Sequence, residues 1–299
     1  MQPEEKILII DFGSQFTQLI TRRVREANVY SEIHSHKISL QEVKTFNPVG
    51  IILSGGPMSV YDSDAPDIDD EILKIKVPIL GICYGLQIIT KKLGGKVEPA
   101  KDREYGRASL NIVKTSPLFL EVMPSSQVWM SHGDYLTALP AGFNVIARSD
   151  HSPIAAASNE DKKIYGVQFH PEVVHTIEGK KIISNFLFEV CNCKGEWTPH
   201  NFIDSNIKEI KEKVGNAKVI CALSGGVDST VAAVLVKKAI GDNLTCIHID
   251  TGLMRKNESR EIGEIFDKKL NLNHIHIDAS ELFLNRLKNI SDPEQKRRI

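Results

Sequence analysis

The sequence lacks the features that would commit it to a membrane or to a disulfide scaffold. Its longest uninterrupted apolar run is the segment 231–236, far short of the ~20 residues that cross a bilayer. The opening Met1-Gln-Pro-Glu-Glu has neither the basic nor the apolar region of a signal peptide. Its 5 cysteines cannot all pair with one another and are too sparse for a disulfide framework. We therefore expect a cytoplasmic protein with no membrane partner and with some free thiols.

An excess of charge of one sign is also missing. Lys and Arg total 37 against 38 Asp and Glu, which gives a net charge of −1 and no broad basic field for nucleic acid. The hydrophobic share of 41% is ordinary for a globular protein. Cys191 and Cys193 have no second Cys or His pair at zinc spacing, so we expect no metal site of the protein's own there. Any nucleotide chemistry must therefore be local.

The length of 299 residues predicts about two domains at ~150 residues each. The segments 6–10, 50–53 and 77–82 are buried-strand patterns, and helical spacing follows at 15–27 and 86–93. This alternation predicts an α/β fold with a mostly parallel sheet flanked by helices. The short strand candidates 108–113, 127–130, 144–147, 154–157 and 164–169 indicate a small antiparallel extension, and a helix over 180–191 follows them.

A second series of strands, turns and helices follows a Pro- and Gly-containing stretch. After a polar helix from about 203 to 214, strands over 217–223, 244–249 and 274–277 predict the start of a second, doubly wound domain. We expect a first domain over 1–192, a linker over 193–202 and an incomplete second domain over 203–299. The chain ends too soon after this second sheet begins to complete it.

A candidate nucleophile lies in Gly81-Ile-Cys-Tyr-Gly85, between a strand and a helix. Small residues two positions before and after Cys83 allow the sharp turn of a nucleophile elbow. The amides at the start of the following helix favour a thiolate and can donate to an oxyanion. The alternative is a buried structural cysteine, which the elbow context disfavours.

A base for this cysteine is offered by His170, with Glu172 two residues further on. Residues two apart in an extended segment point the same way, so Glu172 can orient one imidazole nitrogen while the other faces the thiol. Together Cys83, His170 and Glu172 predict acyl transfer through a thioester.

These motifs, with Ser54-Gly-Gly-Pro57 before them and in this order and spacing, resemble the class I (triad) glutamine amidotransferases over roughly residues 5–192. The resemblance implies that Cys83 attacks the side-chain amide of glutamine and that His170 later activates water. It also implies an oxyanion hole or glutamine-binding role for Gly55, Gly56, Tyr84, Gln87 and a turn with Ser131, Gly133 and Asp134.

A second candidate site is the turn Ser224, Gly225, Gly226, Val227, Asp228, Ser229 and Thr230, which follows an apolar strand and precedes a helix predicted over 231–238. The glycines let the backbone approach an anion, and the hydroxyls and helix terminus suit phosphate. The Gly-Lys-Ser/Thr ending of a Walker A loop is absent. A plain helix cap is the alternative.

The turn is similar to the pyrophosphate-binding loop of the N-type ATP pyrophosphatases. This resemblance implies ATP as a co-substrate, Mg²⁺ near Asp228, and Asp250 close to the adenosine.

The order of the two domains resembles the glutamine-hydrolysing GMP synthase family. It implies that glutamine, ATP and XMP are substrates, that the ammonia released from glutamine aminates ATP-activated XMP, and that the full-length protein is a homodimer. We expect this chain alone to hydrolyse glutamine weakly, bind ATP poorly and make no GMP. Two other functions remain open: a triad glutaminase or γ-glutamyl hydrolase that serves another synthetase, and a non-catalytic nucleotide-sensing module.

Overall fold

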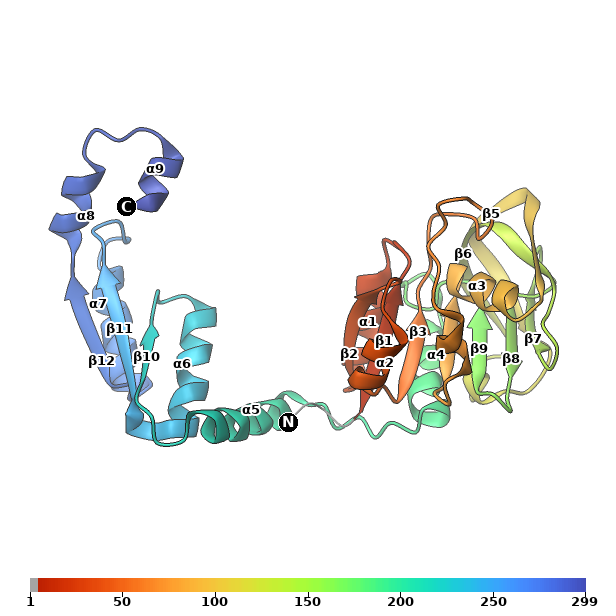
Figure 1. The fold of residues 1–299 in the computed structure, drawn as a ribbon, viewed down its shortest axis with the longest axis horizontal. Helices are drawn as coiled ribbons and strands as arrows, with labels where there is room; N and C mark the ends of the chain where they lie inside the picture. The colour runs from red at the N-terminus through yellow and green to blue at the C-terminus, as the bar shows by residue number, and fades with distance from the viewer. Residues whose placement is uncertain (1–4) are drawn as a thin grey trace. The chain divides into compact units, whose positions relative to one another are not determined.

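The computed structural model describes residues 5–299, apart from the side chains of residues 100–103 and of Pro199. The chain divides into one unit that ends at Thr198 and another over Pro199–Ile299 (Figure 1). This division falls inside the segment 193–202 that was predicted as a linker. Helix α5 (Pro199–Val214) already begins within that segment, so its last residues are helical.

The first unit contains a nine-stranded sheet in the order β2-β1-β3-β4-β9-β8-β7-β5-β6. The first five strands in this order are parallel and the last four pair antiparallel, so the predicted α/β fold with an antiparallel extension is confirmed. The parallel strands are β1 (Lys6–Asp11), β2 (Tyr30–Ser35), β3 (Gly50–Leu53), β4 (Ile79–Ile82) and β9 (Ile164–Val167). The antiparallel strands are β5 (Lys96–Ile112), β6 (Ser125–Ala138), β7 (Asn144–Ser149) and β8 (Ala156–Asn159).

Helices cover both faces of the parallel strands (Figure 1). The helices are α1 (Thr17–Glu26), α2 (Leu40–Phe46), α3 (Tyr84–Lys92) and α4 (Gly179–Asn185), and α4 continues into the π-helical turn η3 (Phe186–Val190). The short 3-10 turns are η1 (Asp70–Lys74) and η2 (Pro117–Phe119). In β1, Ile7 and Ile9 pack in one buried cluster with α1 and α4, and Leu8 and Ile10 pack in another with α2 and α3. This burial on both faces explains the continuous apolar run of the strand.

The second unit contains a three-stranded parallel sheet in the order β10-β11-β12. Its strands are β10 (Val219–Ala222), β11 (Leu244–Asp250) and β12 (His274–Asp278). Its helices are α5, α6 (Val227–Ile240), α7 (Glu258–Glu264), α8 (Ser280–Leu287) and α9 (Pro293–Arg298), with the short turns η4 (Gly241–Asn243) and η5 (Ile265–Lys269).

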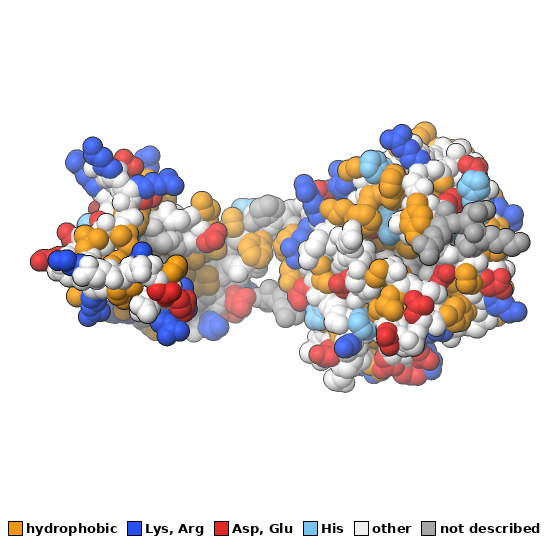
Figure 2. Space-filling view, turned by 90° about the horizontal axis from the view of Figure 1, so that it is seen from above, with side chains coloured by type: hydrophobic (Ala, Val, Ile, Leu, Met, Phe, Trp, Pro, Cys, Tyr) orange, Lys and Arg blue, Asp and Glu red, His pale blue; other side chains and the backbone are white. Residues whose placement is uncertain are grey.

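The two faces of this smaller sheet differ. On one face, Leu244 and Cys246 pack against α6 and against α7 with its continuation η5, in a small buried core. On the other face, Ile220, Ile249 and Ile277 are exposed, and hydrophobic side chains are visible at the surface of the molecule (Figure 2). Across the described residues 5–299, we find no helix both long and apolar enough for a membrane crossing.

A close contact between α3 and β3 predicts a strong effect of a small substitution at Gly85. A Cβ there would lie 2.4 Å from the Leu53 carbonyl oxygen and 2.8 Å from the Leu53 Cβ. We expect Gly85→Ala to lower the free energy of unfolding of the first unit by about 1–3 kcal/mol. Both tryptophans of the chain, Trp129 and Trp197, belong to this unit, so their fluorescence in a urea titration reports it. An unchanged midpoint would contradict this packing.

Candidate functional site

Cys83 lies at a strained turn between β4 and α3. Its φ of 52° and ψ of −105° belong to a region that side-chain-bearing residues rarely adopt. A Cβ at Gly81 would approach the Gly85 carbonyl carbon to 2.6 Å, so the predicted need for small residues at both positions has a steric basis. The Cys83 amide donates to the Val167 carbonyl at 2.8 Å. This bond holds the turn against the end of β9, which leads to His170.

His170 and Glu172 are brought together just after β9. His170 Nδ1 lies 2.8 Å from Glu172 Oε1, and both side chains are buried. Burial alone lowers the pKa of His170, but the charge and hydrogen bond of Cys83, together with those of Glu172, outweigh it and raise the pKa from 6.5 to about 10. The arrangement therefore favours an imidazolium beside a thiolate.

Three further side chains hold these groups, and the sequence analysis assigned none of them a role. Gln168 Nε2 lies 3.7 Å from the Cys83 sulfur. Thr176 Oγ1 donates to the His170 carbonyl at 2.6 Å, and Arg23 Nε donates to the Glu172 carbonyl at 3.0 Å. Gln168 was part of a recognised motif, whereas Arg23 is 149 residues away from its partner. No local pattern signals such a distant contact.

The residues predicted to bind glutamine or an oxyanion gather around Cys83 in part. A Cβ at Gly55 would lie 3.1 Å from His170 Cε1, and one at Gly56 would lie 3.1 Å from Tyr84 Cγ. The Tyr84 ring is buried and its hydroxyl donates to the Pro66 carbonyl. Its backbone N–H is at the first position of α3, where no intrahelical acceptor exists. These positions therefore place backbone amides near the sulfur.

The predicted turn at residues 131–134 is wrong, because these residues lie inside β6. Ser131 pairs with Tyr105, and Asp134 pairs with Pro99 of β5. Pairing along the whole of β6 overrides the turn preference of Gly133 and Asp134. The Ser131 carbonyl still lies at the site, because it accepts from the Cys83 thiol at 3.6 Å.

Gln87 and Asp134 form a buried amide network beside the sulfur. Gln87 Nε2 donates to the Asp134 carbonyl at 3.0 Å and lies 3.4 Å from Gln168 Oε1. Both hydrogens of the Gln87 amide are thus engaged within the protein, which leaves its oxygen as an acceptor. Asp134 Oδ2 is buried and has no hydrogen-bond partner among the described residues. A buried carboxylate oxygen without a partner is costly unless a ligand meets it.

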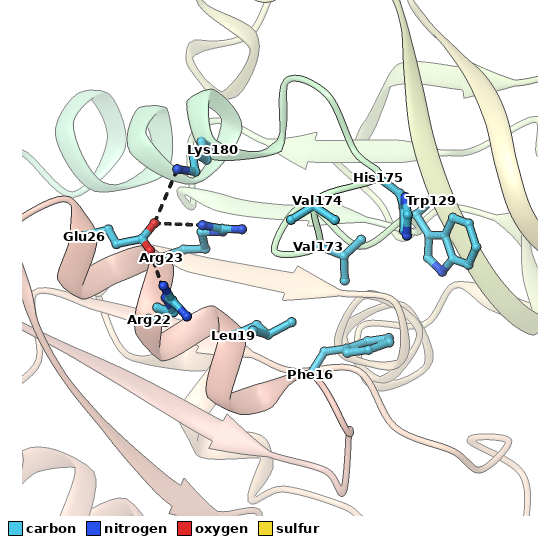
Figure 3. A pocket seen from close by; sticks show the side chains of 10 residues that line it. All are labelled: Phe16, Leu19, Arg22, Arg23, Glu26, Trp129, Val173, Val174, His175 and Lys180. Carbon is cyan, nitrogen blue, oxygen red and sulfur yellow. Dashed lines mark hydrogen bonds and ion pairs between the residues drawn. The ribbon is translucent and has the colours of Figure 1, made fainter.

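A pocket lies on the α1 side of His170 and Glu172 (Figure 3). The ring of Phe16 packs edge-on against His170, with the ring centroids 5.4 Å apart. At the other end, Glu26 lies within ion-pair distance of Arg22, Arg23 and Lys180. The lining of this pocket includes none of the predicted site residues. It therefore supports the site from behind and does not form part of the sulfur's surroundings.

The pKa of His170 gives a first test of this network. We expect Glu172→Gln to lower it, because the charge and hydrogen bond of the carboxylate help to raise it. A proton NMR titration of the imidazole Cε1–H measures the change. In the unchanged protein, the charged imidazole contributes stability below pH 6.5 that is lost as the pH rises through about 10.

Glu71→Gln is the matched control, because Glu71 is exposed and forms its ion pair with Lys74. It should leave the His170 titration unchanged. An ordinary pKa near 6.5 for His170 in the unchanged protein would contradict the described pairing.

The second candidate site begins with a loop that is shorter than the sequence predicted. Helix α6 starts at Val227 rather than at residue 231, so Val227, Asp228, Ser229 and Thr230 form its first turn. The first backbone N–H groups of a helix have no intrahelical acceptor, and Gly226 is the N-cap residue. Extending the helix toward the strand leaves Ser224, Gly225 and Gly226 as the connection.

The hydroxyls of this loop are engaged within it. Ser229 Oγ donates to the Gly226 carbonyl at 3.1 Å and Thr230 Oγ1 donates to the same carbonyl at 2.8 Å. Ser224 Oγ lies 3.1 Å from Ser229 Oγ. Gly225 has a φ of +83°, which glycine adopts without strain. The loop is therefore ordered by its own side chains while its helix-end amides remain open.

Asp250 ends β11, the strand beside the loop. Its Oδ1 accepts from the Gly252 amide at 2.8 Å. That bond, and next a hydrogen bond from Ser259, lower the pKa of Asp250. Asp228 is exposed in the first turn of α6. Both predicted carboxylates thus lie in the second unit, at the carboxyl end of the sheet and at the following helix terminus.

Comparisons with known proteins match both units. The family model for class-I glutamine amidotransferases matches residues 8–190, and the model for NAD synthase matches residues 200–297. A glutamine-hydrolysing GMP synthase of Bacillus subtilis is 54% identical over 99% of this chain, and one of Staphylococcus saprophyticus is 55% identical over the same share. The chain spans 58% of the length of each of these relatives.

The first unit also has relatives among solved structures. The crystal structure of a GMP synthase component from Thermoplasma acidophilum is 30% identical with a TM-score of 0.56, and the match covers 69% of this chain and 100% of that one. The chain therefore belongs to the class-I glutamine amidotransferase family and, including its NAD synthase-type second unit, is similar to glutamine-hydrolysing GMP synthases along nearly its whole length.

Proposed function

We propose that the first unit hydrolyses glutamine through Cys83, His170 and Glu172. The observation that carries the proposal is the strained turn at Cys83 beside the buried His170–Glu172 pair. The Cys83 thiolate attacks the side-chain carbonyl carbon of glutamine. The carbon–nitrogen bond then breaks, and His170 protonates the leaving nitrogen to release ammonia. His170 next takes a proton from water, whose oxygen attacks the γ-glutamyl thioester to give glutamate and the free thiol.

The surroundings of the sulfur suit the other parts of this reaction. The backbone amides of Gly56 and Tyr84 would donate to the oxyanion that forms on the attacked carbonyl. The unpartnered Asp134 Oδ2 suits the α-ammonium group of glutamine, and the Gln87 oxygen suits a polar donor of the same substrate. Gly55, Ser131 and Gly133 would shape the wall of this subsite.

We further propose that the second unit uses the loop from Ser224 to Thr230 to bind the pyrophosphate part of ATP. The loop fits phosphate because Gly225 and Gly226 leave room for a close approach and the first amides of α6 point outward. Mg²⁺ bound with ATP would offset the charge of the phosphates, and Asp228 would hold it. Asp250 would lie near the adenosine.

In the whole protein these units would serve the amination of XMP. The 2-oxygen of XMP would attack the α-phosphorus of ATP and release pyrophosphate, and the ammonia from glutamine would then displace AMP to give GMP. We assign glutamine hydrolysis to residues 1–192 and part of the synthetase to residues 203–299. The identity of 54% to curated GMP synthases supports this assignment, and the chain spans 58% of their length.

Product analysis and a nucleotide titration together test the proposal. The chain should release glutamate and ammonia from glutamine in equal amounts. Addition of Mg·ATP should shift backbone NMR signals of the loop 224–230. Hydrolysis without any shift would favour a hydrolase that serves another synthetase, and shifts without hydrolysis would favour a nucleotide-sensing module. Either result would contradict the combined function.

A further inference from the structure

His248 is a buried histidine that the proposed chemistry does not use. It lies on β11 with 1% of its surface exposed. Its neighbours along one face of the sheet are also histidines: its ring stacks on His276 of β12, with the centroids 5.6 Å apart and the planes at 28°. Helices α6 and α7 cover this face. A buried imidazole in such a place needs polar partners for both ring nitrogens.

Both partners of His248 belong to segments near the phosphate loop. Nδ1 lies 2.8 Å from the carbonyl oxygen of Leu223, the residue immediately before Ser224. Nε2 lies 3.2 Å from Ser259 Oγ in α7. Because a carbonyl can only accept, Nδ1 carries a proton and donates it to Leu223.

The bond to Leu223 falls where the strand pairing stops. The Leu223 amide still donates to the Ile247 carbonyl at 2.9 Å, as in a parallel ladder. No backbone donor to the Leu223 carbonyl is found among the described hydrogen bonds outside regular elements. The imidazole therefore satisfies the last carbonyl before the chain leaves the sheet and turns into the loop.

Helix α7 presses on the same loop from its own side. Ser259 and Ile262 are three residues apart and so share one face of the helix. Ser259 contacts His248 and also hydrogen-bonds Asp250. A Cβ built at Gly225 would lie 2.3 Å from Ile262 Cδ1, which shows how closely that side chain covers the loop. One helix face thus reaches the loop, the histidine and the strand-end carboxylate.

We propose that His248 and Ser259 are positioning residues that fix the exit of the chain from β10 into the phosphate loop and the orientation of Asp250. The inference rests on the proposed role of this loop in binding the pyrophosphate of ATP. His248 holds the Leu223 carbonyl, Ser259 links the imidazole to Asp250, and the loop amides are thereby held ready for phosphate. Neither side chain touches the nucleotide.

Two substitutions at His248 separate the hydrogen bond from the packing. His248→Phe keeps a ring but removes both polar contacts, whereas His248→Asn keeps a donor at the position of Nδ1. With the full chain and an NMR titration of Mg·ATP, we expect the phenylalanine variant to bind about tenfold more weakly. The asparagine variant should stay within about threefold of the unchanged protein.

His276→Phe is the matched control, since it alters a histidine of the same face without touching Leu223, and it should leave the affinity nearly unchanged. Binding by His248→Phe equal to that of the unchanged protein would overturn the inference, as would equal loss in both His248 variants. An unchanged protein that gives no shifts with Mg·ATP would instead contradict the proposed function of the loop.

A measurement without nucleotide tests the arrangement directly. The ¹⁵N chemical shifts of the imidazole report which ring nitrogen of His248 carries a proton. We expect Nδ1 to be protonated in the unchanged chain, with a scalar or exchange-protected contact to the Leu223 carbonyl. A neutral ring protonated on Nε2 alone would overturn the inference even if ATP binds.

Discussion

Replacing Cys83 by alanine should abolish glutamine hydrolysis, with a loss of roughly 10⁴-fold or more in kcat. The reason is that the proposed covalent thioester cannot form without the sulfur, and no other thiol is placed beside His170 and Glu172 by the described contacts. Glutamate production measured by a coupled assay gives the rate. The variant should keep the fold, because the strained backbone at Cys83 is set by the contacts of Gly81 and Gly85.

Cys221→Ala is the matched control for this result. Cys221 is a free, partly exposed thiol on β10 in the other unit, so its removal should leave the rate within about twofold. A Cys83→Ala chain that hydrolyses glutamine at the rate of the unchanged protein would contradict the proposed nucleophile. So would an equal loss in the Cys221 variant.

Gly225→Ala should have the largest effect on the nucleotide site. The residue has a φ of +83°, and an added Cβ would lie 2.3 Å from Ile262 Cδ1. Both the backbone strain and the contact would displace the loop, so we expect Mg·ATP binding to weaken by about tenfold or more. Isothermal calorimetry or the NMR titration measures the affinity, and glutamine hydrolysis should stay unchanged.

Gly241→Ala separates the loop from general backbone strain. Gly241 also has a positive φ, of +59°, but a Cβ there would meet no atom within 4 Å. It should lower stability slightly and leave ATP affinity nearly unchanged. Equal loss of ATP binding in the two variants would mean that the loop geometry is not what binds the nucleotide.

The parts of the fold that local patterns encode were predictable. The apolar strands β1, β3 and β4 are buried on both faces, so each reads as a continuous hydrophobic run. Strand β2 was missed because Tyr30–Ser35 mixes polar and apolar residues near the edge of the sheet. The helix predicted to start at residue 231 starts at Val227, since Gly226 can serve as the N-cap.

The candidate sites divide in the same way. Cys83 with its flanking glycines, and His170 with Glu172, are encoded within short segments, and the structure places each group as a neighbour within its own segment. Residues 131–134 looked like a turn because cross-strand pairing with β5 cannot be seen locally. Arg23 and Thr176 were missed because their partners are backbone carbonyls, which leave no mark on the sequence.

Covalent labelling tests the central claim most directly. The intact chain would be treated with a chloroketone analogue of glutamine, with and without excess glutamine, and its peptides analysed by mass spectrometry. A reactive thiolate at a glutamine site predicts a single adduct on Cys83 that glutamine suppresses. No adduct, or an adduct spread over Cys191, Cys193, Cys221 and Cys246, would contradict the proposal that Cys83 is the glutaminase nucleophile.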